Sequence, residues 1–210
     1  MEVTFYGHSC FRIKGKKGTA VIDPYNKDIG FLMPKVKTDL VLSTHDHVDH
    51  NDFSRVEDYR LVVKGVGSYE VGEIEVDGYS SWHDEKKGQE RGENIIYKIK
   101  VDDVWLVHLG DLGEKLSDKL IEELSVVDIL FIPVGGNYTI DADQAVEIVN
   151  KLSPSIVIPM HFKEEGKEVD VESVDEFIKK MDKEVKRVDR KIKIGKDDLS
   201  EDVEVVLMSR

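Results

Sequence analysis

The stretch that most constrains this chain is STHDHVDHND, residues 43 to 52, which follows the apolar run Leu40 to Leu42. Three histidines and three aspartates occupy these ten positions. So dense a set of ionisable side chains is mutually repulsive and costly to bury unless a partner neutralises it. A divalent cation does so, because it binds imidazoles and carboxylates as ligands. The stretch therefore predicts a metal site at the end of a strand.

The spacing His45-x-His47-x-Asp49-His50 indicates how these ligands are arranged. In an extended segment alternate side chains share one face, so His45, His47 and Asp49 point together. A tighter path after Val48 turns His50 inward beside them. Four potential ligands exceed the roughly three that an open catalytic zinc ion takes, which suggests two ions.

Further ligands are available where other apolar runs end. His83, Asp111 and His161 each follow a short β-rich run. Alone, each is more simply interpreted as a turn aspartate or a hydrogen-bonded histidine. Residues at the ends of different strands converge in one cleft, so together with the dense stretch they indicate a shared metal site.

Short β-rich runs separated by glycines predict strands at residues 3–6, 10–13, 19–22, 40–43, 61–63, 74–76, 95–99, 104–109, 129–133, 156–159 and 203–207. Helical spacing of apolar residues predicts helices over 117–124, 141–152 and 171–181. Thr139 or Asp141 is available as N-cap of the second helix. The charged run 183–193 is interpreted as a solvated face. No repeat or linker divides the chain, so we expect one α/β domain over residues 1–210.

The amino-acid composition limits the classes of partner that the protein can bind. The 210 residues carry a net charge of −13, and such a field repels phosphate backbones and anionic lipid. We therefore expect no nucleic-acid and no membrane partner, and no apolar stretch approaches the ~20 residues of a membrane span. The single cysteine, Cys10, excludes an internal disulfide, and no secretory signal is visible. A cytoplasmic protein is expected, and a homo-oligomer is left open.

These motifs resemble those of the metallo-β-lactamase superfamily. STHDHVDH (43–50) matches its H-x-H-x-D-H motif, VIDP (21–24) its early strand ending in Asp, HLGD (108–111) its bridging Asp, and IPMH (158–161) its late histidine. YGHSCFRI, HDEKKGQERGEN and PVGGNYTIDADQA resemble, more narrowly, a branch of metal-dependent hydrolases that includes the L-ascorbate-6-phosphate lactonases. The resemblance extends over almost the whole chain.

The resemblance implies an α/β fold of the metallo-β-lactamase type, an αββα four-layer sandwich of two mixed β-sheets flanked by helices, with the metals at one edge. It also implies which residues bind the two divalent ions: His45, His47 and His83 the first, Asp49, His50 and His161 the second, with Asp111 as a bridge. Zinc is expected first, and manganese or iron are alternatives, because imidazole and carboxylate ligands suit all three.

Four other residues are candidates for roles around this centre. His108 lies three positions before Asp111 and is interpreted as an outer partner of the metal ligands or as a catalytic residue facing the substrate. The alternatives are the first-site ligand in place of His83 and a buried strand histidine bonded to backbone. His8 either lines the pocket and binds substrate or makes a structural hydrogen bond. Arg91 is a potential clamp for a substrate anion or an exposed charge. Asp23 is interpreted as a carboxylate that orients a ligand or a turn.

Two ions about 3.5 to 4 Å apart lower the pKa of a shared water, so that hydroxide can attack a carbonyl or phosphoryl centre. Asp111 would steady the bridging position, and Asp49 and His108 are candidate proton donors. We therefore predict a metal-dependent hydrolase of a small anionic ester or lactone, with a sugar lactone phosphate suggested by the resemblance. The alternatives are a phosphodiesterase acting on a small or cyclic nucleotide and a non-catalytic metal- or ligand-binding protein.

Overall fold

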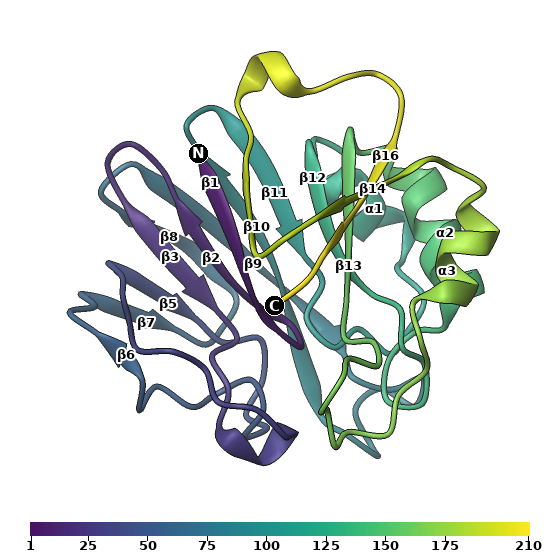
Figure 1. Ribbon diagram of the computed structural model, residues 1–210, viewed down its shortest axis with the longest axis horizontal. Coiled ribbons are helices and arrows are strands. Elements are labelled where there is room, and N and C mark those ends of the chain that lie inside the picture. Colours follow the sequence, from purple (N-terminus) through teal and green to yellow (C-terminus); the bar gives the residue numbers. More distant parts are fainter.

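Two β-sheets face each other in the computed structural model, which describes all residues 1–210 (Figure 1). One sheet contains, in spatial order, β15 (Lys191–Lys193), β1 (Glu2–Gly7), β2 (Cys10–Lys14), β3 (Thr19–Ile22), β5 (Leu40–Leu42) and β7 (Leu61–Val63). The other contains β14 (Val185–Val188), β16 (Glu204–Met208), β13 (Ile156–Met160), β12 (Ile129–Pro133), β11 (Val104–His108), β10 (Glu93–Val101), β9 (Ile74–Trp82) and β8 (Gly67–Val71). A small third sheet pairs β4 (Val36–Lys37) with β6 (Val56–Glu57).

Alternation of side chains along the strands divides the core into layers. In β12, Ile129 and Phe131 point into the space between the sheets, whereas Leu130 and Ile132 point to the outer face. All four side chains are fully buried. The inter-sheet cluster joins apolar residues of both sheets, so the sheets share one core. The single domain over residues 1–210 stays a prediction.

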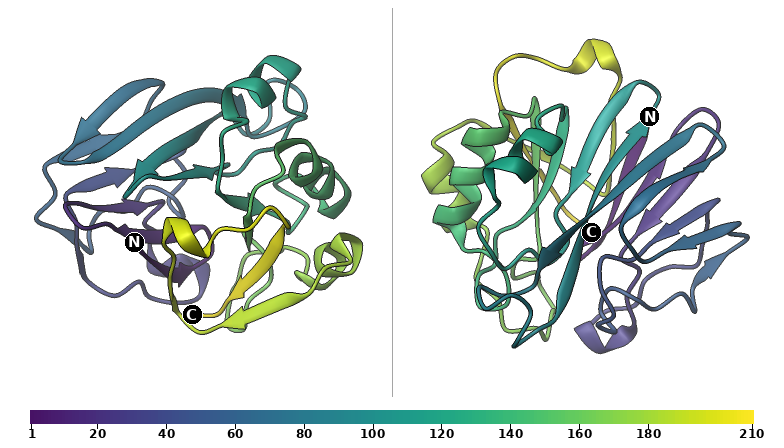
Figure 2. Two further views of the ribbon diagram at one scale, coloured as in Figure 1. Left: turned by 90° about the horizontal axis from the view of Figure 1, so that it is seen from above. Right: turned by 180° about the vertical axis from the view of Figure 1, so that it is seen from behind.

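The outer faces of the two sheets are covered differently. Helices α1 (Asp118–Leu124), α2 (Ala142–Leu152) and α3 (Asp175–Met181) pack on the outer face of the eight-stranded sheet (Figure 2). Loop residues and the 3-10 helix η1 (Lys27–Ile29) cover the six-stranded sheet, and a second 3-10 helix, η2 (Lys196–Asp198), precedes β16. Asn26 caps the start of η1, and Gly30, with φ 101°, ends it. The predicted sandwich is thus confirmed, with a non-α-helical layer on one side.

None of the helices has the length and the apolar character that a membrane span requires.

Strand direction determines where side chains can meet. β11, β12 and β13 are parallel neighbours, and β9 runs in their direction because both β9 and β11 are antiparallel to β10. Likewise β1 and β3 are both antiparallel to β2, and β5 is parallel to β3. The residues that follow these seven strands therefore gather at one edge of each sheet. A 2.9 Å hydrogen bond from the His161 amide to the His8 carbonyl joins the two edges.

Several predicted boundaries differ from the observed ones. β9 extends from Ile74 to Trp82, well beyond the expected 74–76. α3 begins at Asp175 and not at residue 171, because Glu172 exchanges backbone hydrogen bonds with Lys163 and Gly135 instead. β4, β6, β8, β14 and β15 are not predicted. The last two lie in the charged run 183–193, whose side chains there are exposed or half-buried, as expected for a solvated face.

The N-cap of α2 is Asp141, one of the two residues that the sequence pattern allows. Its Oδ1 accepts a hydrogen bond from the Gln144 amide at 2.9 Å, and the Gln144 side chain accepts one from the Asp141 amide at 3.0 Å. We expect Asp141→Ala to lower the free energy of unfolding by about 1 kcal/mol. Asp143→Ala, which removes an exposed carboxylate of the same turn without a cap bond, should have a much smaller effect. Urea unfolding measures both, and equal losses would contradict the capping role.

Candidate metal centre

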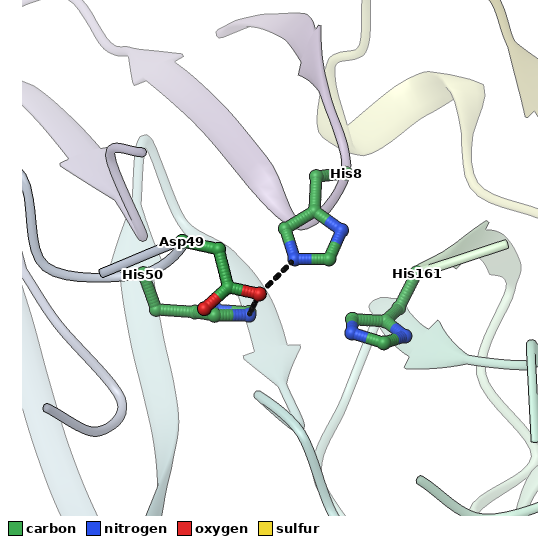
Figure 3. A group of neighbouring side chains, drawn as sticks. All are labelled: His8, Asp49, His50 and His161. Carbon is green, nitrogen blue, oxygen red and sulfur yellow. Dashed lines mark hydrogen bonds and ion pairs between the residues drawn. The ribbon is translucent and has the colours of Figure 1, made fainter. Parts of the chain in front are cut away.

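Side chains that follow strand ends converge where the edges of the two sheets meet. Their ligand atoms form three overlapping groups, each within 4.8 Å: His45, His47 and His83; His8, Asp49, His50 and His161; and His45, His50 and Asp111. Figure 3 shows the four side chains of the second group pointing toward one another. The structure thus brings together every residue that the sequence predicts as a metal ligand, and adds His8.

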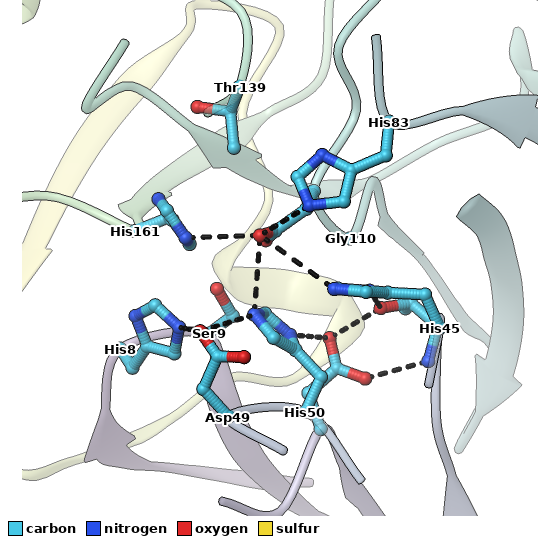
Figure 4. A network of polar contacts seen from close by, with 12 residues as sticks. His8, Ser9, His45, Asp49, His50, His83, Gly110, Thr139 and His161 are labelled. Carbon is cyan, nitrogen blue, oxygen red and sulfur yellow. Dashed lines mark hydrogen bonds and ion pairs between the residues drawn. The ribbon is translucent and has the colours of Figure 1, made fainter. Parts of the chain in front are cut away.

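The rings of His45, His50, His83 and His161 surround one point (Figure 4). Asp111 lies among these four rings. Its Oδ2 is 3.1 Å from Nε2 of His161 and 3.3 Å from Nε2 of His50, both in the second group. The same oxygen is 3.5 Å from Nε2 of His83 and 4.0 Å from Nε2 of His45, both in the first group. One carboxylate therefore contacts both groups, which is the position that a bridging ligand needs.

The cluster contains buried polar atoms that no protein group satisfies. His45 Nε2, His50 Nε2 and Asp111 Oδ1 are buried and have no hydrogen-bond partner. Such atoms are rare, and each costs roughly 1–3 kcal/mol when left unpaired. Imidazole nitrogens and carboxylate oxygens are the donors that zinc, manganese and iron accept. The residues present therefore fit divalent cations.

Burial keeps most of the imidazoles neutral. It is the main cause that lowers the pKa of His45 to about 2. Burial also lowers the pKa of His83 and of His161, although the Asp111 carboxylate opposes the shift at both. A neutral imidazole is the form that binds a metal ion, so these side chains are already in the ligand state at neutral pH.

His50 and Asp111 are shifted in the opposite sense. Burial disfavours the charged form of His50, but Asp111, Asp23 and Asp49 outweigh it and raise the pKa of His50 well above its usual value. Burial would raise the pKa of Asp111, yet His161 and His50 hold it well below the usual range. In the metal-free protein, a charged His50 therefore compensates the buried carboxylates.

Asp23 orients His50. Its buried carboxylate lies 2.9 Å from His50 Nδ1, and it accepts hydrogen bonds from the amide and the hydroxyl of Thr44, each at 2.8 Å. With Nδ1 held in this way, His50 presents Nε2 to Asp111. Outer carboxylates that fix the ring of a metal-binding histidine usually also strengthen it as a ligand. These contacts agree with the orienting role expected for Asp23.

Asn94 positions Asp111, a role that no sequence pattern indicated. Its Oδ1 accepts a hydrogen bond from the Asp111 amide at 2.9 Å, while its Nδ2 donates to Ser81 Oγ at 2.8 Å and to the Leu109 carbonyl at 2.9 Å. Gly110 makes the intervening turn with φ +57°, and a Cβ there would collide with Asn94 and Thr44. The backbone of Asp111 is thus held between two strand ends.

Three residues of this edge have left-handed backbone conformations. φ is 59° at His8, 49° at Asp23 and 54° at His161. Each directly follows a strand, and such conformations cost non-glycine residues roughly 1–3 kcal/mol. They persist only where the surroundings enforce them, and they cluster at functional sites. Their presence at this edge supports a functional role for it.

His108 lies outside the three groups. Its side chain is fully buried, with Nε2 3.0 Å from the Ser9 carbonyl oxygen, and Nδ1 accepts a hydrogen bond from the Gly110 amide at 3.2 Å. Backbone groups thus contact both ring nitrogens of His108. This placement argues against the catalytic, substrate-facing role predicted for His108 and agrees with the alternative, a buried strand histidine that supports the turn before Asp111.

The two residues predicted to bind substrate lie at different depths. His8 is fully buried, and its Nε2 is 3.1 Å from Asp49 Oδ2. It is therefore placed to hold Asp49 and not to meet solvent. Arg91 lines a cavity beside His45 and His47, with its guanidinium carbon 5.4 Å from the centre of the Tyr138 ring. Arg91 can thus reach a molecule that occupies this cavity.

Comparisons with known proteins agree with this fold and site. Residues 2–161 match the family described as the β-lactamase superfamily domain. The chain is 30% identical over 192 residues to a UPF0173 metal-dependent hydrolase of Thermoplasma acidophilum, covering 77% of this chain and 83% of that protein. It is 31% identical to another UPF0173 metal-dependent hydrolase, from Pelotomaculum thermopropionicum, covering 77% of this chain and 84% of that protein. A crystal structure of a Thermotoga maritima protein of the metallo-β-lactamase superfamily has a TM-score of 0.82, 30% identity and 99% coverage of both chains.

The sandwich and its edge cluster define a metal-dependent hydrolase of the metallo-β-lactamase superfamily, and that prediction is confirmed at this level. Within the superfamily, the chain belongs to the UPF0173 family of metal-dependent hydrolases. The narrower resemblance to the L-ascorbate-6-phosphate lactonases stays a prediction.

The charged His50 makes the stability of the metal-free protein depend on pH. A histidine whose pKa is raised by folding contributes its full stability below the unfolded value of 6.5 and loses it as the pH rises through the folded pKa. We therefore expect the free energy of unfolding of chelator-treated protein to fall as the pH rises above neutrality. His50→Gln should flatten this fall, as urea unfolding at a series of pH values will show. A wild-type stability that is constant above neutral pH would contradict a charged His50.

Proposed function

We propose that this edge binds two divalent cations, with zinc first and manganese or iron as alternatives. His45, His47 and His83 would hold one, and Asp49, His50 and His161 the other. The observation that supports this most is the position of Asp111, whose Oδ2 lies within 4.0 Å of imidazoles from both groups. A single catalytic zinc ion takes about three protein ligands, so one ion would leave most of these groups unused.

Bound here, the cations would supply an acidified water and a Lewis acid for the oxygen of a carbonyl or phosphoryl group. The chain's own residues hold the ligands in place: Asn94 fixes Asp111, Asp23 fixes His50, and His8 fixes Asp49. Burial would raise the pKa of Asp49, but His50 and His8 outweigh it and lower that pKa. The Asp49 carboxylate, partly open to solvent, is therefore ionised and in the form that binds a cation.

We infer that the reaction is hydrolysis of a small anionic ester or lactone. Arg91, beside His45 and His47, supports an anionic substrate, because guanidinium groups bind carboxylate and phosphate through paired hydrogen bonds. The sequence resemblance makes a sugar lactone phosphate the first compound to test. The net charge of −13 argues against nucleic acid and anionic membranes as partners. A cytoplasmic location remains part of this proposal.

A substrate screen tests the reaction. The purified protein, reloaded with zinc or manganese, is assayed against lactones, carboxylic esters and phosphodiesters, the last including small and cyclic nucleotides. We expect turnover of a lactone or ester that disappears after chelation. Turnover of phosphodiesters alone would replace this proposal by the phosphodiesterase alternative. A fully metal-loaded protein that hydrolyses nothing in the screen would favour a binding protein.

Removing one ligand tests the metal assignment. His47→Ala should lose one equivalent of metal and nearly all activity, since it takes an imidazole from the first group. His108→Gln is the matched control: it changes a buried histidine of the same edge that lies in no group, and should keep the full metal content. Elemental analysis of both variants measures this. Unchanged metal in His47→Ala would refute the assignment.

A further inference from the structure

A polar cavity of about 310 Å³ lies directly beside the first ligand group. His45 and His47 form part of its wall, together with two cationic residues, Lys64 and Arg91. Lys64 follows β7 of the six-stranded sheet, and Arg91 precedes β10 of the eight-stranded sheet. The cavity therefore places one positive charge from each sheet next to the predicted metal centre, in a chain whose net charge is −13.

The side chains of Lys64 and Arg91 both lie over aromatic rings. Lys64 Nζ lies 5.0 Å from the centre of the Phe53 ring, and the Arg91 guanidinium carbon 5.4 Å from the centre of the Tyr138 ring. A ring face attracts a cation without using its hydrogen-bond donors. The rings therefore restrain the two side chains and leave their N–H groups available to a ligand.

The protein carboxylates near these cations are loosely paired with them. Lys64 Nζ is 3.5 Å from Asp46 Oδ1, and Arg91 Nη1 is 3.9 Å from Glu90 Oε2. The Asp46 side chain is 87% exposed, and exposed pairs of this kind contribute little to stability. An anion that enters the cavity can thus displace both partners at small cost.

We propose that Lys64 and Arg91 bind a phosphate monoester of the substrate as a recognition group, while the bond to be hydrolysed lies at the metal centre. This inference rests on the proposed function, because it assigns the anionic part of the same substrate. A carboxylate carries one charge and is satisfied by Arg91 alone, whereas a phosphate monoester carries nearly two charges and three acceptor oxygens. Two cations from separate sheets match the phosphate.

The remaining polar wall indicates what the phosphate is attached to. Asp46 and Glu93 also line the cavity, and ionised carboxylates only accept hydrogen bonds. Hydroxyl groups are the neutral donors that suit them. The cavity thus favours a small polyhydroxylated molecule with a phosphate monoester, over a nucleobase or an apolar chain.

Binding of a small probe tests the clamp, that is the pair Lys64 and Arg91, without any turnover. Glycerol 1-phosphate has hydroxyls and a phosphate monoester but no lactone or carboxylic ester, and glycerate replaces the phosphate by a carboxylate. We expect the zinc-loaded protein to bind glycerol 1-phosphate more tightly than glycerate in calorimetric titrations. Lys64→Met and Arg91→Met should each weaken glycerol 1-phosphate binding by about tenfold, and Lys64→Arg should restore most of it.

Lys100→Met is the matched control, since Lys100 also pairs with a carboxylate, Glu75 at 3.2 Å, and lies 5.6 Å from a ring centre, that of Trp105. Lys100 lies near the opposite end of β10, so Lys100→Met should leave binding unchanged. Wild-type affinity in both Lys64→Met and Arg91→Met, at full metal content, would overturn the clamp even if lactones are hydrolysed. Equal affinity for glycerate would overturn the choice of phosphate. Failure of the substrate screen, with the clamp effects intact, would instead reject only the proposed reaction.

Discussion

The carboxylate of Asp111 is the group around which the site is built. Four imidazoles from two ligand groups lie 3.1 to 4.0 Å from one of its oxygens, and its other oxygen is buried without a partner. Burial keeps three of those imidazoles neutral, so the positive charge that compensates the carboxylates comes from His50 and from the buried Lys167. Cations complete such a cluster, and their binding energy then becomes part of the folding energy.

The two sheets contribute unequal shares to this edge. The six-stranded sheet supplies His8, Asp23 and the dense stretch after β5, while the eight-stranded sheet supplies His83, Asp111 and His161 from the ends of β9, β11 and β13. Each proposed ion would take ligands from both sheets. The metals would therefore connect the two halves of the sandwich at the edge where backbone hydrogen bonds from His161 to His8 and from Ile95 to Thr44 already join them.

Local sequence patterns predicted the parts of the site that depend on nearby residues. The spacing of His45, His47, Asp49 and His50 within one turn indicated a metal before any fold was known. Local patterns did not decide between His83 and His108, because both lie at the end of a strand. In the structure His83 belongs to the ligand group of His45 and His47, whereas the His108 ring contacts the Ser9 carbonyl and the Gly110 amide. Asn94 and Lys64 were not predicted, since their roles arise from contacts with residues distant in the sequence.

We propose that this edge holds a pair of metal ions bridged by Asp111. Anomalous diffraction from crystals of the zinc-loaded protein, recorded on both sides of the zinc absorption edge, tests it most directly. We predict two anomalous peaks flanking Asp111, one among His45, His47 and His83 and one among Asp49, His50 and His161. A map without a peak in the cluster, or with a single ion that Asp111 does not contact, would contradict the account.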